Sequence, residues 1–101
     1  MSRIHWTPQA SKDLDAIHEY VSRDAPAYAG VLIARLIVAV DQLERFVESG
    51  RIVPEAGDPA LRELIRGPYR IVYQIRDGDA EVITVHHAAR PLPPDITDRA
   101  G

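Results

Sequence analysis

The stretch "YRIVYQIRDGDAEVITVHH", residues 69–87, decides the fold class of this chain. It contains two runs rich in β-branched and aromatic residues, separated by the polar residues Asp77, Gly78 and Asp79. That composition is typical of two strands joined by a tight turn. The sequence therefore predicts a β-hairpin with strands at 69–76 and 80–87.

The length of this turn determines which residues face each other across the hairpin. A two-residue turn would place Arg70 opposite Val85, whereas a three-residue turn over 77–79 would place Arg70 opposite His86. A shift of one residue moves every side chain of a strand to the other face of the sheet. We prefer the three-residue turn because it separates apolar from polar side chains better. It predicts an apolar face from Ile71, Tyr73, Ile75, Ile83 and Val85, and an open polar face from Arg70, Gln74, Thr84 and His86.

The residues before the hairpin predict one short strand and two helices. Residues 3–6 are β-prone, and Thr7 followed by Pro8 is a typical helix start, which we expect to end before Pro26. The second helix is predicted from a cap at Asp24 to Ser49, with Gly50 as its C-terminal cap.

A further strand is predicted at 61–66, after a loop at 50–60 and before a turn at 67–68. The order β-α-α-β-β-β indicates an α+β fold, with a two-helix hairpin packed on one face of a small antiparallel sheet. We expect one domain over residues 1–91, followed by a proline-rich tail at 92–101 that does not form a strand.

Composition narrows the class of protein. The chain has 101 residues, a net charge of −3 and no cysteine, so a disulfide scaffold and cysteine-based zinc sites are excluded. The longest apolar stretch, 31–40, is interrupted by Arg35 and is about half of the roughly 20 residues that a membrane span needs. The absence of cysteine fits a reducing compartment, and we expect no membrane partner. The acidity argues against nonspecific binding to nucleic acid, and we expect no direct sequence-specific DNA binding by this chain alone.

No metal or other cofactor is expected. His86 and His87 are neighbours in a predicted strand, so their side chains point to opposite faces and cannot share one metal ion.

Four segments, in this order, resemble the RelE/ParE superfamily of type II toxin–antitoxin toxins, in its ParE-like (plasmid stabilisation) branch. They are "WTPQASKDL" at 6–14, "ESGRIVPE" at 48–55, "LRELIRGPYRIVYQI" at 61–75 and "ITVHHAARP" at 83–91. The resemblance implies a small cytoplasmic toxin that a cognate antitoxin, ParD-like or similar, neutralises in a hetero-oligomer. Members of the superfamily either inhibit DNA gyrase or cleave messenger RNA on the ribosome.

RNA cleavage without a metal needs a general base, a general acid and cations around the phosphate. For a RelE-like nuclease, the resemblance implies that Arg70 holds the phosphate, with His87 and Arg90 as the other catalytic candidates.

The chain departs from the nuclease pattern at several positions. Its only lysine is Lys12, the loop before the predicted strand at 61–66 is acidic at Glu55 and Asp58, and no tyrosine follows Tyr73. Alanines 88 and 89 stand where such nucleases tend to be basic. The preferred interpretation is therefore a gyrase inhibitor that is not itself an enzyme. The alternatives are a ribosome-dependent messenger RNA endoribonuclease and a protein that binds its antitoxin but has lost toxicity.

The candidate contacts with a target or an antitoxin lie on the strands and on the segment 86–94. Simpler roles stay open for two of them: an ion pair between Arg62 and Glu63, and pairing of Arg70 with Glu63, with Glu81 or with a carboxylate of the antitoxin. The candidates are Arg62, Arg66, Arg70, His86, His87 and Arg90.

Overall fold

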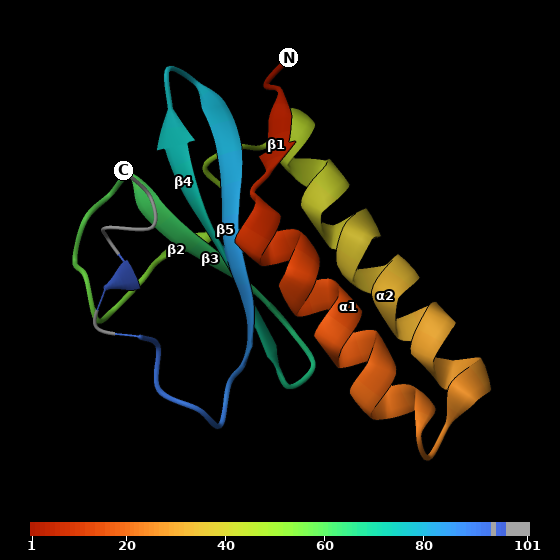
Figure 1. Ribbon diagram of the computed structural model, residues 1–101. Helices are drawn as coiled ribbons and strands as arrows, with labels where there is room; N and C mark the ends of the chain where they lie inside the picture. Colours follow the sequence, from red (N-terminus) through yellow and green to blue (C-terminus); the bar gives the residue numbers. More distant parts are fainter. Residues whose placement is uncertain (94, 97–101) are drawn as a thin grey trace.

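A computed structural model describes residues 1–93, 95 and 96, and it confirms the α+β architecture. Two helices pack on one face of a five-stranded sheet, with the strand order β1-β5-β4-β3-β2 (Figure 1). Strand β1 runs parallel to β5, and the other pairs are antiparallel. The elements are β1 (Ile4–Trp6), α1 (Pro8–Ser22), α2 (Pro26–Asp41), the 3₁₀ turn η1 (Gln42–Glu44), β2 (Arg51–Ile52), β3 (Leu61–Arg66), β4 (Tyr69–Arg76) and β5 (Asp79–His87).

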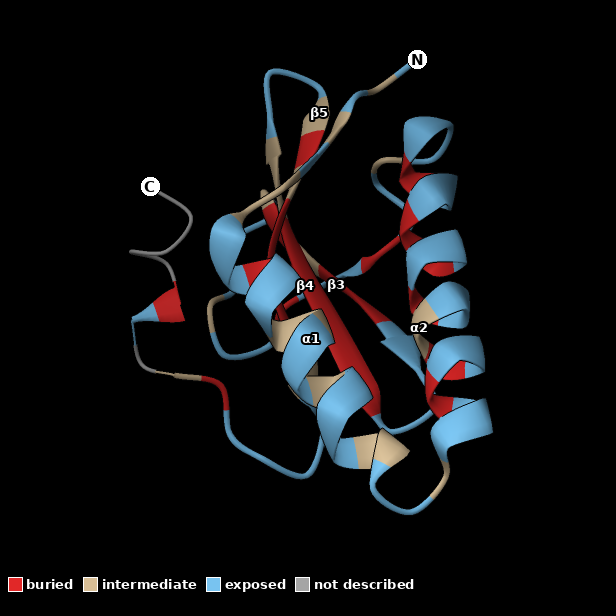
Figure 2. Ribbon diagram, turned by 45° about the vertical axis from the view of Figure 1, so that its right-hand side comes forward, coloured by how far each residue is buried: buried red, intermediate tan, exposed pale blue. Residues whose placement is uncertain are grey.

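Helix α1 starts at the predicted cap, which also attaches it to the sheet. The Thr7 hydroxyl accepts the Ala10 N–H at 3.2 Å and donates to the Val82 carbonyl at 2.7 Å. The helices bury one side each and leave the other side exposed (Figure 2). The main core lies between them and the sheet, and it includes Leu36, Val40, Leu43, Ile71 and Val85.

The second helix ends well before the predicted Ser49. It stops at Asp41 and passes through η1, because the segment that follows is held on the sheet. The Tyr73 hydroxyl donates to the Val47 carbonyl at 2.7 Å and accepts the Gly50 N–H at 2.9 Å.

We had predicted that Gly50 caps the second helix, and this prediction is wrong. A Cβ atom at this position would lie 2.6 Å from the Tyr73 hydroxyl and 2.8 Å from the Glu63 carbonyl. Glycine is required here because two other parts of the chain approach it closely. At the other end of α2 the predicted cap is also displaced by one residue, since Ala25 and not Asp24 occupies the cap position.

The hairpin has the predicted pairing but not the predicted turn. Arg70 faces His86, yet the turn has two residues, Asp77 and Gly78, with φ angles of 52° and 81°. A β-bulge shifts the pairing by one residue between Val72 and Tyr73, because Ile83 of β5 has no partner in β4. This shift has the same effect on the pairing of Arg70 as a turn that is one residue longer. The bulge also places Ile83 on the face opposite to Val82 and Val85, contrary to the apolar face that we predicted.

The expected open polar face is wrong as well. A second core covers the face of the sheet that the helices leave free, where the loop 53–60 and the segment after β5 lie (Figure 1). Leu92 and Ile96 belong to this core, although the sequence placed them in the tail. Thr84 is also buried, and its hydroxyl donates to the Asp13 carboxylate of α1. The second core consists of Val53, Leu61, Val72, Ile83, Leu92 and Ile96.

The segment Pro26–Glu44 is long and apolar enough to cross a membrane by length and composition alone. The core helix of a soluble protein passes the same test, and α2 buries Leu32, Leu36 and Val40 in the main core. The packing accounts for part of its apolar character, while Tyr28, Val31, Ile37 and Val38 are exposed.

Candidate interaction site

The six candidate residues fall into two separate groups. Because neighbours in a strand point to opposite faces, Arg70 faces the second core and Tyr69 faces the helices. His87 packs edge-on against Tyr69, with ring centroids 5.5 Å apart and planes at 77°. The structure therefore does not bring Arg70 and His87 together on one face.

Arg70 is enclosed between two carboxylates. Its Nε donates to Glu63 Oε1 at 2.5 Å, while Nη1 and Nη2 donate to the two oxygens of Glu55 at 2.7 and 2.9 Å. These hydrogen bonds lower the pKa of Glu55 to about 2 and raise the pKa of Arg70 above its usual value. Each nitrogen atom of the guanidinium already donates to a carboxylate, so a phosphate group could reach the outer fork of Arg70 only by displacing Glu55.

Glu63 connects this pair to a second arginine. Its side chain is fully buried, and its Oε2 accepts the Arg51 Nε–H at 2.6 Å. We call Arg51, Glu55, Glu63 and Arg70 the Arg70 network. Its two positive and two negative charges cancel, which is what a buried charge cluster requires. The pairing of Arg70 with Glu63 agrees with the simpler role left open by the sequence, whereas Glu55 was missed because a loop carries it.

Arg62 and Arg66 bind the backbone more than they bind other charges. Arg62 donates to the carbonyls of Pro59, Glu48 and Gly50 at 2.8, 3.1 and 3.1 Å, so it holds the loop in place. The predicted ion pair of Arg62 with Glu63 is replaced by these bonds and by the Arg70 network. Arg66 donates to its neighbouring carbonyl, of Ile65, at 2.8 Å.

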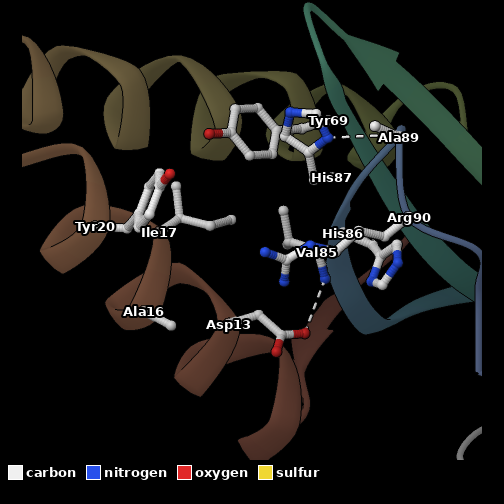
Figure 3. A pocket seen from close by; sticks show the side chains of 10 residues that line it. All are labelled: Asp13, Ala16, Ile17, Tyr20, Tyr69, Val85, His86, His87, Ala89 and Arg90. Carbon is white, nitrogen blue, oxygen red and sulfur yellow. Dashed lines mark hydrogen bonds between the residues drawn. The ribbon is translucent and has the colours of Figure 1, made fainter.

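The other three candidates lie around a hollow of about 520 Å³, which we call the α1–β5 hollow (Figure 3). Helix α1 forms one side, and the ends of β4 and β5 form the other. After β5 the chain turns back, with the Arg90 N–H donating to the His87 carbonyl at 3.0 Å, and this turn holds Arg90 beside the opening. The hollow is lined by Asp13, Ala16, Ile17, Tyr20, Tyr69, Val85, His86, His87, Ala89 and Arg90.

The α1–β5 hollow presents aromatic and cationic groups to solvent. Tyr20 is 70% exposed, and His87 and Arg90 are exposed as well. Burial raises the pKa of Tyr69, so this phenol stays protonated near neutral pH. The one carboxylate in the lining, Asp13, accepts bonds from Thr84 and from the Val85 N–H.

The histidines have internal partners. His87 Nδ1 accepts the Ala89 N–H at 3.1 Å, and His86 Nε2 lies 3.0 Å from the Pro91 carbonyl. Within residues 1–93, 95 and 96, no three His, Cys, Asp or Glu side chains gather in a way that could hold a metal ion. The arrangement suits recognition of a partner better than proton transfer.

Comparisons with known proteins agree with this architecture. Residues 4–92 match the family described as the ParE toxin of the type II toxin–antitoxin system parDE. The chain is similar to the toxin RelE2 of Caulobacter vibrioides, with 36% identity over 89% of this chain and 99% of that protein.

Two solved structures share the fold. One is the chromosomal ParDE toxin–antitoxin system of P. aeruginosa, with a TM-score of 0.73 and 22% identity over 86% of this chain and 96% of that one. The other is the toxin–antitoxin complex RelBE2 of Mycobacterium tuberculosis, with a TM-score of 0.60 and 19% identity over 85% of this chain and 96% of that one. The chain therefore belongs to the ParE toxin family of type II toxin–antitoxin systems, within the RelE/ParE superfamily.

Proposed function

We propose that this protein is a toxin that inhibits DNA gyrase by binding to it, and that a cognate antitoxin neutralises it. The observation that supports binding over RNA cleavage is the position of Arg70. Its guanidinium is occupied by Glu55 and Glu63, and it faces away from His87. Metal-free RNA cleavage would need these groups to converge on one phosphate.

The α1–β5 hollow is the best candidate for the gyrase contact. Tyrosine and arginine dominate the binding energy of many protein interfaces, and here Tyr20, Tyr69 and Arg90 surround one hollow. The turn after β5 fixes Arg90 before any partner arrives, which lowers the entropy cost of binding.

The antitoxin is proposed to cover the exposed side of α2. Tyr28, Val31 and Val38 are exposed there, and their spacing places them along one side of the helix. An amphipathic segment that folds on binding would bury these side chains. The two solved structures named above are toxin–antitoxin systems, which supports an antitoxin partner for this chain. We expect a complex with one or two copies of each chain.

Two measurements on the intact toxin test this function. Purified protein should inhibit the supercoiling activity of gyrase, and its expression should cause double-strand DNA breaks with an SOS response. Tyr20→Ala and Arg90→Ala should each raise the concentration needed for inhibition by about tenfold or more. Phe46→Ala is the matched control, because Phe46 is an equally exposed aromatic residue outside the hollow.

One outcome of the expression experiment would contradict the gyrase proposal. If expression causes cleavage of messenger RNA in the ribosomal A site without DNA damage, the gyrase proposal is wrong. Arg70, His87 and Arg90 would then return as catalytic candidates, after a rearrangement that brings them together.

A further inference from the structure

The Arg70 network has an inner and an outer member. The side chain of Glu63 is 0% exposed and that of Arg70 is 9% exposed, whereas that of Glu55 is 46% exposed. Glu63 is held from both sides, by Arg70 and Arg51, so it cannot leave without exposing a buried cluster. Glu55 stands at the surface and contacts the network only through Arg70.

The contact of Glu55 has the geometry of a ligand in a binding site. Nη1 and Nη2 of Arg70 form a fork that grips both carboxylate oxygens, which is the preferred arrangement for recognising a carboxylate. Glu63 fixes the Nε end and thereby points the fork outward. The site is thus oriented before anything binds.

We propose that Arg70 is a receptor for an acidic side chain of a peptide partner, and that Glu55 occupies this site until the partner displaces it. The loop 53–60 then acts as an internal competitor. This inference rests on a peptide partner such as the proposed antitoxin, but it does not depend on gyrase being the target.

A carboxylate suits the site better than a nucleic-acid chain does. Without Glu55, the network keeps the charges of Arg51, Arg70 and Glu63, which leave a net of one positive charge. One carboxylate neutralises that charge. A nucleic-acid strand would bring several phosphates, and a site with one net positive charge neutralises only one of them.

The loop can release Glu55 without unfolding. The N–H groups of Ala56 and Gly57 donate to the Val53 carbonyl at 3.1 and 3.0 Å, which forms a turn of its own. Val53 is buried in the second core, so the base of the loop stays anchored. Only the outward side chain of Glu55 has to swing away.

Competition between Glu55 and an added peptide tests the proposal. The probe is the synthetic peptide acetyl-Val-Pro-Glu-Ala-Gly-amide, which copies residues 53–57, and its counterpart with Gln for Glu. NMR titration at low salt should show the Glu peptide binding to the Glu55→Gln protein about tenfold more tightly than to the unchanged protein. Glu81→Gln removes an equal charge from the sheet away from Arg70, and it should leave binding unchanged.

Two further comparisons make the result decisive. The Gln peptide should not bind more tightly to the Glu55→Gln protein than to the unchanged protein. The Glu peptide should also not bind more tightly to the double variant Glu55→Gln with Arg70→Lys, since lysine keeps the charge but cannot bind both carboxylate oxygens as arginine does. Equal binding of both peptides, or equal binding by the unchanged and Glu55→Gln proteins, would overturn the proposal. Tight binding of single-stranded RNA in place of the peptide would also overturn it. Cooperative thermal unfolding of the Glu55→Gln protein and of the double variant confirms that each titration reports on a folded chain.

Discussion

The Arg70 network and the α1–β5 hollow meet at the start of β4, where one residue belongs to the hollow and the next belongs to the network. Tyr69 and His87 border the hollow, and Arg70, one residue along β4, belongs to the network on the opposite face. In the network every charge has an internal partner, whereas in the hollow aromatic and cationic groups face solvent. The difference separates charges that a partner can reach only by displacing Glu55 from groups that a partner can contact directly.

The largest expected effect is on stability when the network loses its central arginine. Arg70→Leu leaves the buried Glu63 carboxylate with Arg51 alone, and breaking a buried pair in this way costs about 3–5 kcal/mol. Arg90→Leu, in the hollow, should change the free energy of unfolding by less than about 0.5 kcal/mol. Urea denaturation of both variants checks this, and equal losses would remove the distinction between the two regions.

Truncation of the chain after Arg90 should lower the free energy of unfolding nearly as much as Arg70→Leu does. It removes Leu92 and Ile96 from the second core, and burial of each is worth about 1.5–3 kcal/mol. A chain that ends at Ile96 keeps both side chains and is the matched control. If the shorter chain is as stable as the longer one, the second core does not support the network. Loss of toxicity in the shorter chain therefore reports on folding before it reports on a target.

Adding a methyl group at Gly50, where Tyr73 and Glu63 approach closely, should have an intermediate effect on the free energy of unfolding. In Gly50→Ala the new Cβ would lie 2.6 Å from the Tyr73 hydroxyl, and such overpacking costs about 1–3 kcal/mol. Gly30→Ala in α2 meets nothing within 4 Å and should instead stabilise by about 0.5–1 kcal/mol. Thermal unfolding of both variants should thus show shifts of opposite sign, and shifts of the same sign would contradict the packing around Tyr73.

The smallest expected effect is a pH dependence that belongs to the network alone. The pKa of Glu55 is about 2 in the folded chain, compared with 4.5 for a free side chain. Its contribution to stability is therefore complete above about pH 4.5 and is lost as the pH falls toward 2. The difference in urea midpoint between the unchanged protein and Glu55→Gln should shrink over this range. A constant difference down to pH 2 would mean that Glu55 does not pair with Arg70 in solution.

The sequence predicted both helices, the other four strands and the pairing of the hairpin, because strand alternation and helix caps are local signals. It predicted residues 50–60 as a loop and missed β2, a two-residue strand that is defined by its pairing with β3. It placed Arg70 opposite His86 correctly but through the wrong turn, since a bulge adds the same offset as a longer turn and leaves no mark in the composition. The early end of α2 depends on the Tyr73 hydroxyl, which lies 26 residues beyond Val47 in the chain. Long-range contacts of this kind are invisible to periodicity.

The candidate site was also predicted only in part from the sequence. The basic end of β5 identified His86, His87 and Arg90, but Tyr20 was missed because a tyrosine on the polar side of a helix gives no signal of its own. Glu55 was read only as an acidic departure from the nuclease pattern. Its role became visible when the loop was placed over Arg70.

The pairing of β1 with β5 determines when the sheet can be completed during synthesis of the chain. Ile4, near the start of the chain, lies beside Ala80 in the finished sheet. A ribosome makes the N-terminus first, at about 5–20 residues per second, so β1 waits several seconds for its partner strand. The first strand cannot be seated before almost the whole message has been translated. The sheet of each new chain is therefore completed only near the end of its own synthesis.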